Sequence, residues 1–596
     1  MHGFEPEIRR VISKEKERAL KVFCVTEEAQ ERLKTAGIPS EILYDFQGYV
    51  GAADEPSWDR VFELSDELRS SAEKNEQLRF SGINFLTMEY HIIKYVYAVK
   101  LSNLLKKMEE QGCEVIVLVL TVSFISWMAD INTPMIKTVK YGYPIRARTV
   151  VKFSLNLMVE GKAILVYAIN YFQKLFGGNG TIQDKDQKRP KVLFLLSYIM
   201  YARAAMAIVD ACPTNGLIPY IATDNKGLTM LLESHHAEYR IKPPVLLSAF
   251  FHMREFLLLP YRLKRHINSF YDSRPEAKED EFSAAYLCRI ILLGELRTIC
   301  FMAISCILFL EKLIKDISPD ILCVMPQDRF LQQIGSALMK RKNRGLVLAC
   351  SASWEVNNAS SFRRHIHADK LAVLGGKIRD IYLGSGLKPE RIVVTGAAHF
   401  DQLFNRDMEH DDRELLRCGI DPKDRIVLFA TQPSTIREIE DMLSGIISAV
   451  RKTEDIQLVV KTHPSEDIRP YQTAIEKYND FKIHVVRDIE LYALISRCEL
   501  LITKHSTVAL EAMMVDKPVV TINLTGQPDP VTYAREGAAI GVYQKDDIKP
   551  AILKALNDEE TRRQLKAARD IFVRNWAGEP DGKASQRIVN LMKKML

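Results

Sequence analysis

The stretch CELLITKHSTVALEAMMVDKPVVTINL, residues 498–524, contains a strand, a turn, a helix and a second strand in succession. Its opening apolar run is typical of a buried strand, and the residues Lys504, His505, Ser506 and Thr507 form the turn before the helix. The backbone amides at the beginning of a helix, together with two hydroxyls and a cation, favour binding of a phosphate group. The stretch therefore predicts a parallel α/β sheet with an anion-binding turn.

Glu511 lies four residues after Thr507, one helical turn further on. At this spacing its carboxylate can face the same ligand and accept hydrogen bonds from ribose hydroxyls. The alternative is that Ser506 is an ordinary N-cap and Glu511 an ordinary surface carboxylate. The stretch alone leaves both interpretations open.

A second motif, LVVKTHPSED at residues 458–467, places a histidine at the end of another apolar run. Pro464 biases the preceding residue toward extended geometry, so we expect His463 to lie at the strand tip and not inside a helix. Its imidazole can then serve a ligand. The alternative is a histidine that caps a helix or packs in the core.

A third strand, in DRIVLFATQPS at residues 424–434, is followed by the polar residues Thr431 and Gln432. In a doubly wound domain the carboxyl ends of all parallel strands lie at one edge of the sheet. We therefore expect three separate turns to converge on one space that could hold a nucleotide.

Strands and amphipathic helices alternate along the whole chain, which predicts parallel sheets flanked by helices. At about 100–200 residues per domain, a chain of 596 residues is expected to form three to four domains. The Gly-rich polar segment at 177–190 suggests one boundary. The predicted parts are an N-terminal α/β accessory domain at 1–135, a mainly helical connector and linker at 136–189, and two Rossmann-like domains that face a cleft, at 190–405 and 406–596.

Composition excludes several classes of protein. The net charge of +6 is too small to indicate nucleic-acid binding. The ten cysteines are scattered singly, which is typical of reduced thiols in a cytosolic protein and not of zinc or disulfide frameworks. The N-terminus is charged where a signal peptide would be apolar, and the longest apolar runs fall short of the roughly 20 residues of a membrane span. We expect a cytoplasmic protein.

Three segments together resemble the C-terminal half of the two-Rossmann (GT-B) glycosyltransferase superfamily. They are KTHPSE at 461–466, ITKHSTVALEAMMVDKPVVTINL at 502–524, and HADKLAVLGGKIRDIYLGSGLKPERIVVTGAAHFDQLF at 367–404. Within that superfamily the chain is similar to surface-polysaccharide transferases, CDP-glycerol glycerophosphotransferases, His-Pro motif sialyl- and polysialyltransferases, and UDP-N-acetylglucosamine 2-epimerases. The resemblance covers roughly residues 320–545 and extends the fold back to about residue 190. Residues 1–180 resemble no family.

The resemblance implies roles for individual residues. His463 would contact the phosphate of the donor nucleotide, with Pro464 shaping the turn, and Ser506 and Thr507 would bind phosphate as well. Glu511 would hold the ribose. The turn of Thr395 and Gly396 would lie at the cleft between the domains, and no metal or other cofactor would be needed.

The chemistry of transfer adds candidates. A departing nucleotide phosphate is stabilised by hydrogen-bond donors and positive charge, which His463 and Lys504 could supply, so His463 is also a catalytic candidate. An acceptor hydroxyl needs a general base from the facing domain. Asp328 and Glu355 are the candidates, and the alternative for each is a structural carboxylate.

Departures from these families bear on the activity. The epimerases carry a Gly-Thr-Arg-Pro-Glu segment after their first strand and a Glu-Ala-Gly run near the cleft, where this chain has LLSYIMYAR at 195–203 and CSASWEV at 350–356. This difference argues against epimerisation. The CDP-glycerol enzymes usually carry an aspartate before their serine pair, where this chain has Lys504 and His505. The base of the donor nucleotide stays open.

Two other stretches are weaker signals. His365 and His367 could face one way on a strand, but a third metal ligand is missing, and we assign no metal. The segment 137–153 interleaves basic and aromatic residues, which would suit contact with anionic lipid or form a solvated face.

We therefore expect a metal-independent GT-B-type glycosyltransferase that moves a sugar, or a related polyol-phosphate unit, from a nucleotide-activated donor to a glycan or lipid-linked acceptor. Such an enzyme would act in surface-polysaccharide biosynthesis, in the cytoplasm or peripherally at the inner face of the membrane. The alternatives are a nucleotide-sugar epimerase or hydrolase of the UDP-N-acetylglucosamine 2-epimerase type, and a non-catalytic nucleotide-sugar-binding module. The sugar, the acceptor and the oligomeric state are left open.

Overall fold

The computed structural model describes residues 189–223, 253–274, 303–325, 330–351 and 367–596, with short gaps in every one of these ranges except 253–274, and shorter pieces elsewhere, most of them before residue 142. The chain divides into two compact units. The first unit comprises 1–189, 240–319 and 328–345, and the second comprises 190–239, 320–327 and 346–596.

The first unit contains a parallel sheet of four strands in the order β2-β1-β5-β6. These strands are β1 (Leu20–Cys24), β2 (Glu41–Ile42), β5 (Val115–Thr121) and β6 (Ile136–Tyr141). The same unit contains the helices α1 (Glu5–Lys14), α9 (Met253–Asp272) and α12 (Phe330–Arg341), and a short hairpin of β3 (Arg79–Phe80) and β4 (Ile83–Asn84). The predicted boundary at 135/136 falls at the beginning of strand β6. The β-branched residues of this strand favour its pairing with β5, so both strands belong to one sheet.

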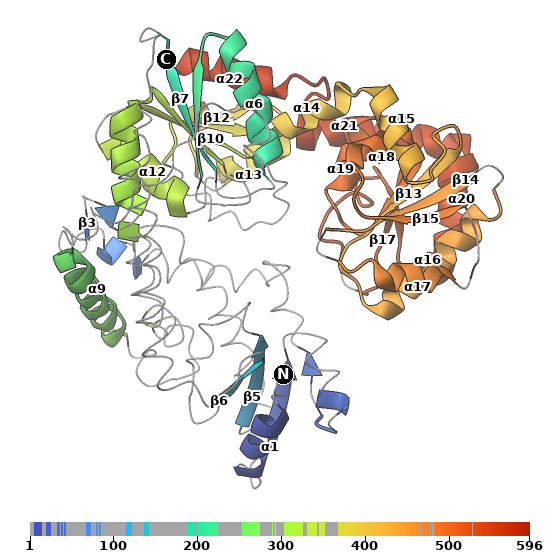
Figure 1. Ribbon diagram of the computed structural model, residues 1–596, viewed down its shortest axis with the longest axis horizontal. Coiled ribbons are helices and arrows are strands. Elements are labelled where there is room, and N and C mark those ends of the chain that lie inside the picture. Colours follow the sequence, from blue (N-terminus) through green and yellow to red (C-terminus); the bar gives the residue numbers. More distant parts are fainter. Residues whose placement is uncertain are drawn as a thin grey trace, which may run out of the picture. The chain divides into compact units, whose positions relative to one another are not determined.

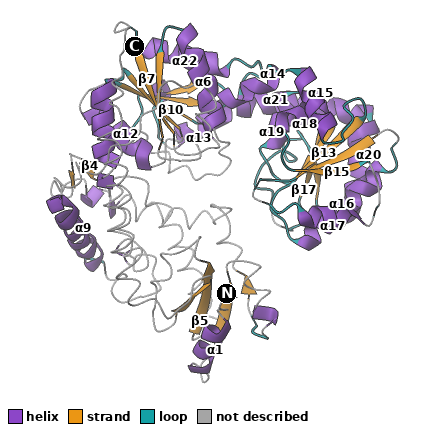
Figure 2. Cartoon of the chain, viewed as in Figure 1, coloured by secondary structure: helices purple, strands orange, loops and turns teal. Residues whose placement is uncertain are grey.

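The second unit contains two parallel sheets of six strands each, which Figure 2 shows flanked by helices. The first six-stranded sheet has the order β12-β11-β10-β9-β7-β8. Its strands are β7 (Lys191–Leu196), β8 (Ile218–Thr223), β9 (Ile321–Met325), β10 (Leu346–Cys350), β11 (Lys370–Val373) and β12 (Ile392–Val394). Every residue of β9 is buried, which is typical of a parallel strand covered on both faces.

One face of this sheet packs against α6 (Ala202–Thr214) and α22 (Ala584–Met595). The shared core includes Phe194 from the sheet, Ile208 from α6 and Val589 from α22. Three thiols, of Cys212, Cys323 and Cys350, lie in the same core, and burial raises the pKa of Cys212 to about 12. Buried thiols with a raised pKa are protonated and unreactive.

The second six-stranded sheet has the order β15-β14-β13-β16-β17-β18, and all neighbouring strands are parallel. Its strands are β13 (Arg425–Ala430), β14 (Ile456–Lys461), β15 (Ile483–Val486), β16 (Cys498–Thr503), β17 (Val519–Ile522) and β18 (Ile540–Val542). The central strand β13 has β14 on one side and β16 on the other. This order places the three predicted strands of the candidate site next to one another.

Helices cover both faces of the second sheet (Figure 1). One face packs against α16 (Ile436–Val450), α17 (Arg469–Glu476) and α20 (Ile548–Asn557). Four further helices do not belong to this core and contact one another or the strands. They are α15 (Met408–Arg417), α18 (Leu491–Arg497), α19 (Val508–Met514) and α21 (Glu559–Ala577). The helix α16 begins with a capping box in which Thr435 and Glu438 exchange hydrogen bonds, so its start next to the candidate site is well fixed.

The chain crosses back from the second sheet to the first between α21 and α22. The carboxylate of Asp401 accepts hydrogen bonds from the backbone amides of Ala584 (2.9 Å) and Ser585 (2.8 Å), and so caps the start of α22 from a distant part of the sequence. The apolar residues Ile588, Val589, Leu591 and Met592 of α22 thus belong to the core of the first sheet, although they follow the second sheet in sequence.

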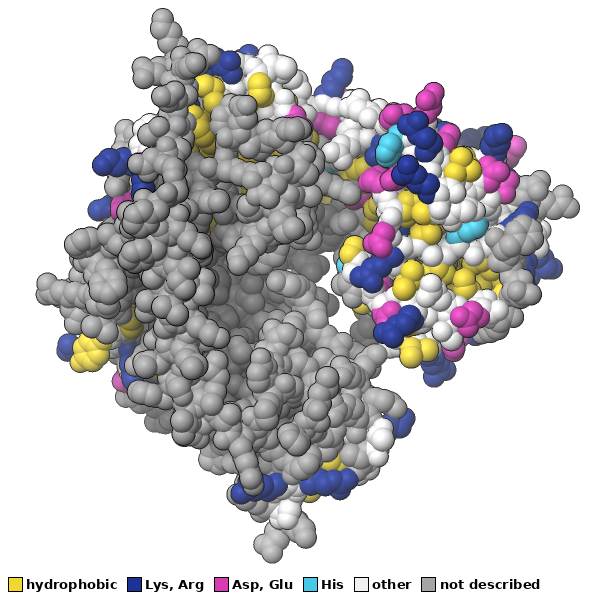
Figure 3. Space-filling view, in the orientation of Figure 1, with side chains coloured by type: hydrophobic (Ala, Val, Ile, Leu, Met, Phe, Trp, Pro, Cys, Tyr) yellow, Lys and Arg dark blue, Asp and Glu magenta, His cyan; other side chains and the backbone are white. Residues whose placement is uncertain are grey.

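The predicted fold class is confirmed, with two Rossmann-like parallel sheets and an additional N-terminal α/β region. The division into four domains stays a prediction. On the face shown in Figure 3, acidic and basic side chains are interspersed over the described surface, in keeping with the small net charge.

Candidate functional site

The carboxyl edge of the second sheet gathers the predicted turns. Ala430, the last residue of β13, pairs with Lys461 at the end of β14, and its carbonyl accepts a hydrogen bond from the Thr503 hydroxyl at the end of β16 (2.8 Å). The three strands therefore end at one level. The polar turns that follow them lie side by side, as the sequence predicts.

The turn after β13 is hydrogen-bonded to the turn after β16. The side-chain oxygen of Gln432 accepts a hydrogen bond from the backbone amide of His505 (2.7 Å). The Ser434 hydroxyl accepts one from the ammonium group of Lys504 (3.1 Å). Gln432, predicted as a ligand-binding residue, therefore has a structural bond to the neighbouring turn.

His463 lies two residues beyond β14 and outside any helix, as predicted for a residue that precedes a proline. Its backbone amide donates to the Thr431 hydroxyl (3.0 Å) and to a carboxylate oxygen of Glu466 (3.2 Å). Both His463 and Pro464 are exposed, and the carbonyl of Pro464 accepts a hydrogen bond from Arg487 (2.7 Å). The backbone of this turn is thus fixed while the imidazole reaches the surface at the sheet edge.

Glu466 is a site residue that the sequence analysis missed. Its carboxylate accepts hydrogen bonds from the hydroxyls of Thr431 (2.5 Å) and Tyr471 (2.6 Å) in addition to the His463 amide. Thr431 is buried, so its side chain serves this internal network. The available signal was the spacing of an acidic residue three positions after the His-Pro histidine.

Lys504 has an internal carboxylate partner. Its ammonium group lies 3.3 Å from Glu438, and only 10% of its side chain is exposed. Although burial raises the pKa of Glu438, the hydrogen bond from the Thr435 amide and the charge of Lys504 outweigh it and hold that pKa below its ordinary value. The positive charge predicted at the phosphate site is therefore partly neutralised by Glu438.

His505 borders a second polar network. Although its side chain reaches solvent, surrounding protein atoms and the charge of Lys504 lower its pKa, against the opposite effect of Asp529. Asp529 accepts hydrogen bonds from Asn523 (2.7 Å) and from Tyr543 (2.7 Å), and this bond raises the pKa of Tyr543 to about 12. The turns after β17 and β18 thus extend the polar edge beyond the predicted residues.

Ser506 and Thr507 precede α19, which has seven residues. The Ser506 hydroxyl accepts a hydrogen bond from the Val508 amide (3.3 Å), as an ordinary capping serine does, and the Ser506 carbonyl accepts one from Tyr533 (2.9 Å). Thr507 is exposed, and its side chain makes no capping bond. The hydroxyl of Thr507 therefore lies at the surface of the edge.

Glu511 is 8% exposed, so the alternative of a surface carboxylate is wrong. It lies close to the buried phenol of Tyr533, whose pKa is raised first by burial and then by the negative charge of Glu511. Its backbone amide donates to the Thr507 carbonyl (3.2 Å), so this buried carboxylate belongs to the first turn of α19.

Thr395 and Gly396 lie in a different environment. The Thr395 side chain is buried, and its carbonyl accepts a hydrogen bond from Arg587 of α22 (2.7 Å). Gly396 has a φ of +80°, and a Cβ there would lie 3.1 Å from the Ala584 side chain. The structure thus packs this turn against the start of α22.

The remaining candidates lie largely outside the described residues. Asp328 and Glu355, predicted as general bases, both fall there, as do His365 and most of the basic segment 137–153. Among the described residues, no group of three or more His, Cys, Asp or Glu is placed to hold a metal ion. Within the same residues, no helix is both long enough and apolar enough to traverse a bilayer.

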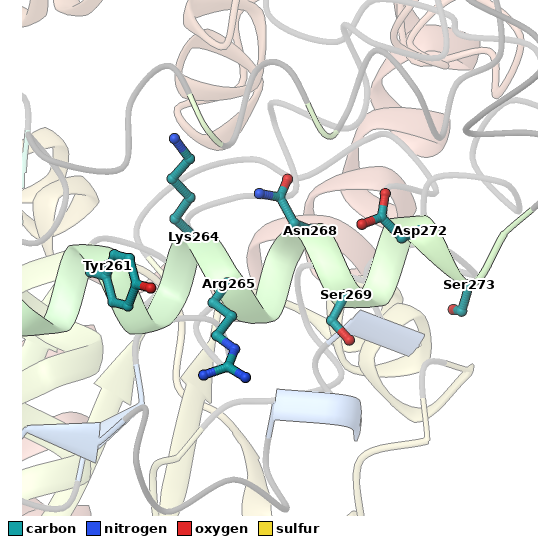
Figure 4. A pocket seen from close by; sticks show the side chains of 7 residues that line it. All are labelled: Tyr261, Lys264, Arg265, Asn268, Ser269, Asp272 and Ser273. Atoms are coloured by element: carbon teal, nitrogen blue, oxygen red, sulfur yellow. The ribbon is translucent and has the colours of Figure 1, made fainter.

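A hollow of about 610 Å³ lies elsewhere, along α9 of the first unit. In Figure 4, Lys264 and Asn268 point to one side of the helix while Arg265 points to the other. Asp272, which also lines it, pairs with Arg289 (2.9 Å). None of the predicted site residues lines this hollow.

A helix-covered parallel sheet whose strand-end turns present an imidazole, hydroxyls and the start of a helix defines a Rossmann-type ligand-binding domain. Residues 369–593 match the family model described as UDP-N-acetylglucosamine 2-epimerase. The chain is 22% identical over 317 residues to the UDP-N-acetylglucosamine 2-epimerase of Bacillus subtilis (strain 168), a match that covers 50% of this chain and 78% of that protein.

Solved structures of such epimerases are also similar to this chain. A crystal structure of a UDP-N-acetylglucosamine 2-epimerase gives a TM-score of 0.47 at 18% identity, covering 68% of this chain and 95% of that one. The Neisseria meningitidis epimerase bound to UDP-GlcNAc gives a TM-score of 0.45 at 14% identity, covering 68% and 100%.

The prediction of a glycosyltransferase is wrong, because the matching family model and the curated relative are both described as epimerases. The roles expected for the His-Pro and Ser-Thr turns follow from a resemblance that includes both transferases and epimerases, so those turns could not separate transfer from epimerisation. The segments that argued against an epimerase, 195–203 and 350–356, precede residue 369, where the family match begins.

Proposed function

We propose that this chain acts on UDP-N-acetylglucosamine, as an epimerase of the 2-epimerase type, and binds the nucleotide at the carboxyl edge of the second sheet. The observation that carries the proposal is the family match over 369–593, which contains all of that sheet and every turn at its edge. The similar Neisseria meningitidis structure is described as bound to UDP-GlcNAc.

The edge has suitable chemistry for a nucleoside diphosphate. The imidazole of His463 and the hydroxyl of Thr507 are exposed on turns that flank the turn after β13. Hydrogen-bond donors placed in this way can contact phosphate oxygens. The Ser506 hydroxyl can donate a hydrogen bond to a phosphate oxygen while its own oxygen still accepts one from the Val508 amide. Glu511, in the first turn of α19, is the proposed acceptor for ribose hydroxyls.

Inversion at C2 of the sugar requires that the C2–H bond be broken and reformed on the opposite face of the ring. At least one group that exchanges protons with solvent must therefore reach C2. Asp328 and Glu355, which follow β9 and β10 of the first sheet, are the proposed candidates for this role.

The experiment is incubation of the purified chain with UDP-N-acetylglucosamine in D₂O, without an acceptor, followed by proton NMR. We expect the anomeric signal of the C2 epimer to grow in and deuterium to enter C2. His463→Ala should weaken the reaction at least tenfold, the equivalent of about 1.4 kcal/mol, while Asp467→Asn should leave it unchanged. Absence of both product and deuterium would contradict the proposed activity, and UDP binding without conversion would indicate the non-catalytic alternative.

A further inference from the structure

The carboxylate of Glu466 joins three elements at the proposed site. One oxygen accepts from the Thr431 hydroxyl (2.5 Å) and from the His463 amide (3.2 Å), and the other accepts from the Tyr471 hydroxyl (2.6 Å). Thr431 follows β13, His463 follows β14, and Tyr471 belongs to α17. A single side chain therefore fixes the separation of two turns and one helix.

This arrangement is built into the fold. Thr431 is 4% exposed and Tyr471 is 1% exposed, so neither hydroxyl can turn to bulk solvent for a partner. A buried hydroxyl that loses its acceptor is left unsatisfied, which destabilises the folded chain. The pKa of Tyr471 is raised by burial first and by Glu466 next, so the phenol stays a hydrogen-bond donor. The Tyr471 hydroxyl therefore keeps its proton for the bond to Glu466.

The network also determines how His463 can meet a ligand. Its backbone amide is already bonded to Thr431 and Glu466, and the Glu466 amide in turn donates to the His463 carbonyl (2.9 Å). The peptide groups of His463 are therefore used within the turn. The imidazole is what this residue can offer to a ligand, and the fixed backbone sets the direction of the Cα–Cβ bond from which the ring projects.

We propose that Glu466 is a positioning residue that orients the imidazole of His463 toward the diphosphate of a bound uridine nucleotide. This inference rests on the proposed function, because it takes UDP as the ligand. Glu466 does not itself touch the ligand, since its oxygens are occupied by three donors from the protein. Its neighbour Asp467 is exposed and pairs with Arg469, so it provides a matched control.

The test is a double-mutant cycle on UDP affinity, measured by isothermal titration calorimetry. Glu466→Gln keeps the shape but replaces one acceptor oxygen with a donor, and it should weaken UDP binding by about tenfold. If Glu466 acts through His463, the double variant Glu466→Gln/His463→Ala should bind UDP within about twofold of His463→Ala alone. Multiplicative losses, or wild-type affinity of Glu466→Gln, would overturn the proposal.

Two further variants keep the test decisive. Tyr471→Phe removes one donor and leaves the carboxylate, so it should weaken UDP binding by about twofold to threefold even if Glu466→Gln folds poorly. Asp467→Asn should bind UDP as the wild type does. An effect of Asp467→Asn equal to that of Glu466→Gln would show a general charge effect and overturn the positioning role.

A measurement without ligand separates this inference from the proposed function. The Cε1–H resonance of His463, assigned by its loss in His463→Ala, should shift in Glu466→Gln and stay in place in Asp467→Asn. If wild type fails to bind UDP, the proposed function fails while the shifted resonance still supports positioning. An unshifted resonance in Glu466→Gln overturns the positioning role whatever the ligand.

Discussion

The turns that follow the strands differ between the two six-stranded sheets. After β11 and β12 of the first sheet, Gly375 allows close approach of the end of α21, and Gly396 allows close approach of the start of α22. After β13, β14 and β16 of the second sheet, polar side chains hydrogen-bond across neighbouring turns. The same parallel topology thus has two outcomes. Small turn residues in the first sheet allow α21 and α22 to pack closely, whereas larger polar turn residues in the second sheet form an edge suited to a ligand.

A substitution where Gly375 packs against the end of α21 should have the largest effect on the free energy of unfolding. In Gly375→Ala the new Cβ would lie 2.4 Å from the carbonyl carbon of Trp576 and 2.5 Å from the Asn575 oxygen, both backbone atoms. Because backbone cannot rotate away, we expect the free energy of unfolding to fall by about 3 kcal/mol in urea denaturation. Gly384→Ala, on the adjoining helix α13 (Gly376–Gly384), meets nothing within 4 Å and should be neutral or slightly stabilising.

The side chain of Asp401, which caps the start of α22, should also contribute to the free energy of unfolding. Asp401→Ala removes the acceptor of the Ala584 and Ser585 amides, so we expect a loss of about 2 kcal/mol in the free energy of unfolding. Asp570→Ala, at an exposed position of α21, should change stability by less than about 0.5 kcal/mol. Equal effects of the two changes would contradict a capping role for Asp401.

Lys504 tests whether the edge of the second sheet is held by internal bonds. Lys504→Met leaves Glu438 without its cationic partner, so we expect a loss of about 1.5 kcal/mol in urea denaturation. UDP affinity should fall by less than about threefold because the ammonium already serves Glu438 and Ser434. A loss of affinity as large as that of His463→Ala would show direct contact between Lys504 and the phosphate.

The capping box of α16 should give the smallest effect and a defined pH dependence. The pKa of Glu438 in the folded chain lies below its ordinary value of 4.5, so its stabilising effect is complete above that pH and is lost as the pH falls through the folded value. Glu438→Gln should lower the free energy of unfolding by about 1 kcal/mol at pH 7. The difference from wild type should shrink as the pH is lowered toward 3.5, and a difference that grows would contradict this assignment.

Much of the fold could be predicted from short-range patterns. The β-branched runs before Thr431, Thr462 and Lys504 predict parallel strands, and parallel strands bring their carboxyl ends to one edge. The effect of Pro464 on His463 is equally local. These features need no knowledge of distant parts of the chain.

Other features depend on contacts between distant residues. The bond from His505 to Gln432 spans 73 residues, and the bond from Thr431 to Glu466 spans 35. The apolar face of α22 predicts burial but not which sheet buries it. The predicted activity, glycosyl transfer, was wrong because the residues used to predict it resemble those of both transferases and epimerases. These short motifs alone do not separate the two activities.

Hydrogen–deuterium exchange with and without UDP tests the central contrast most directly. We predict slower exchange on UDP binding in peptides that contain Thr431, His463 and Ser506, because bound phosphate stabilises these turns. Peptides that contain Gly375 and Gly396 should exchange at unchanged rates. Protection confined to the glycine turns, or no protection at saturating UDP, would contradict the assignment of the ligand edge to the second sheet.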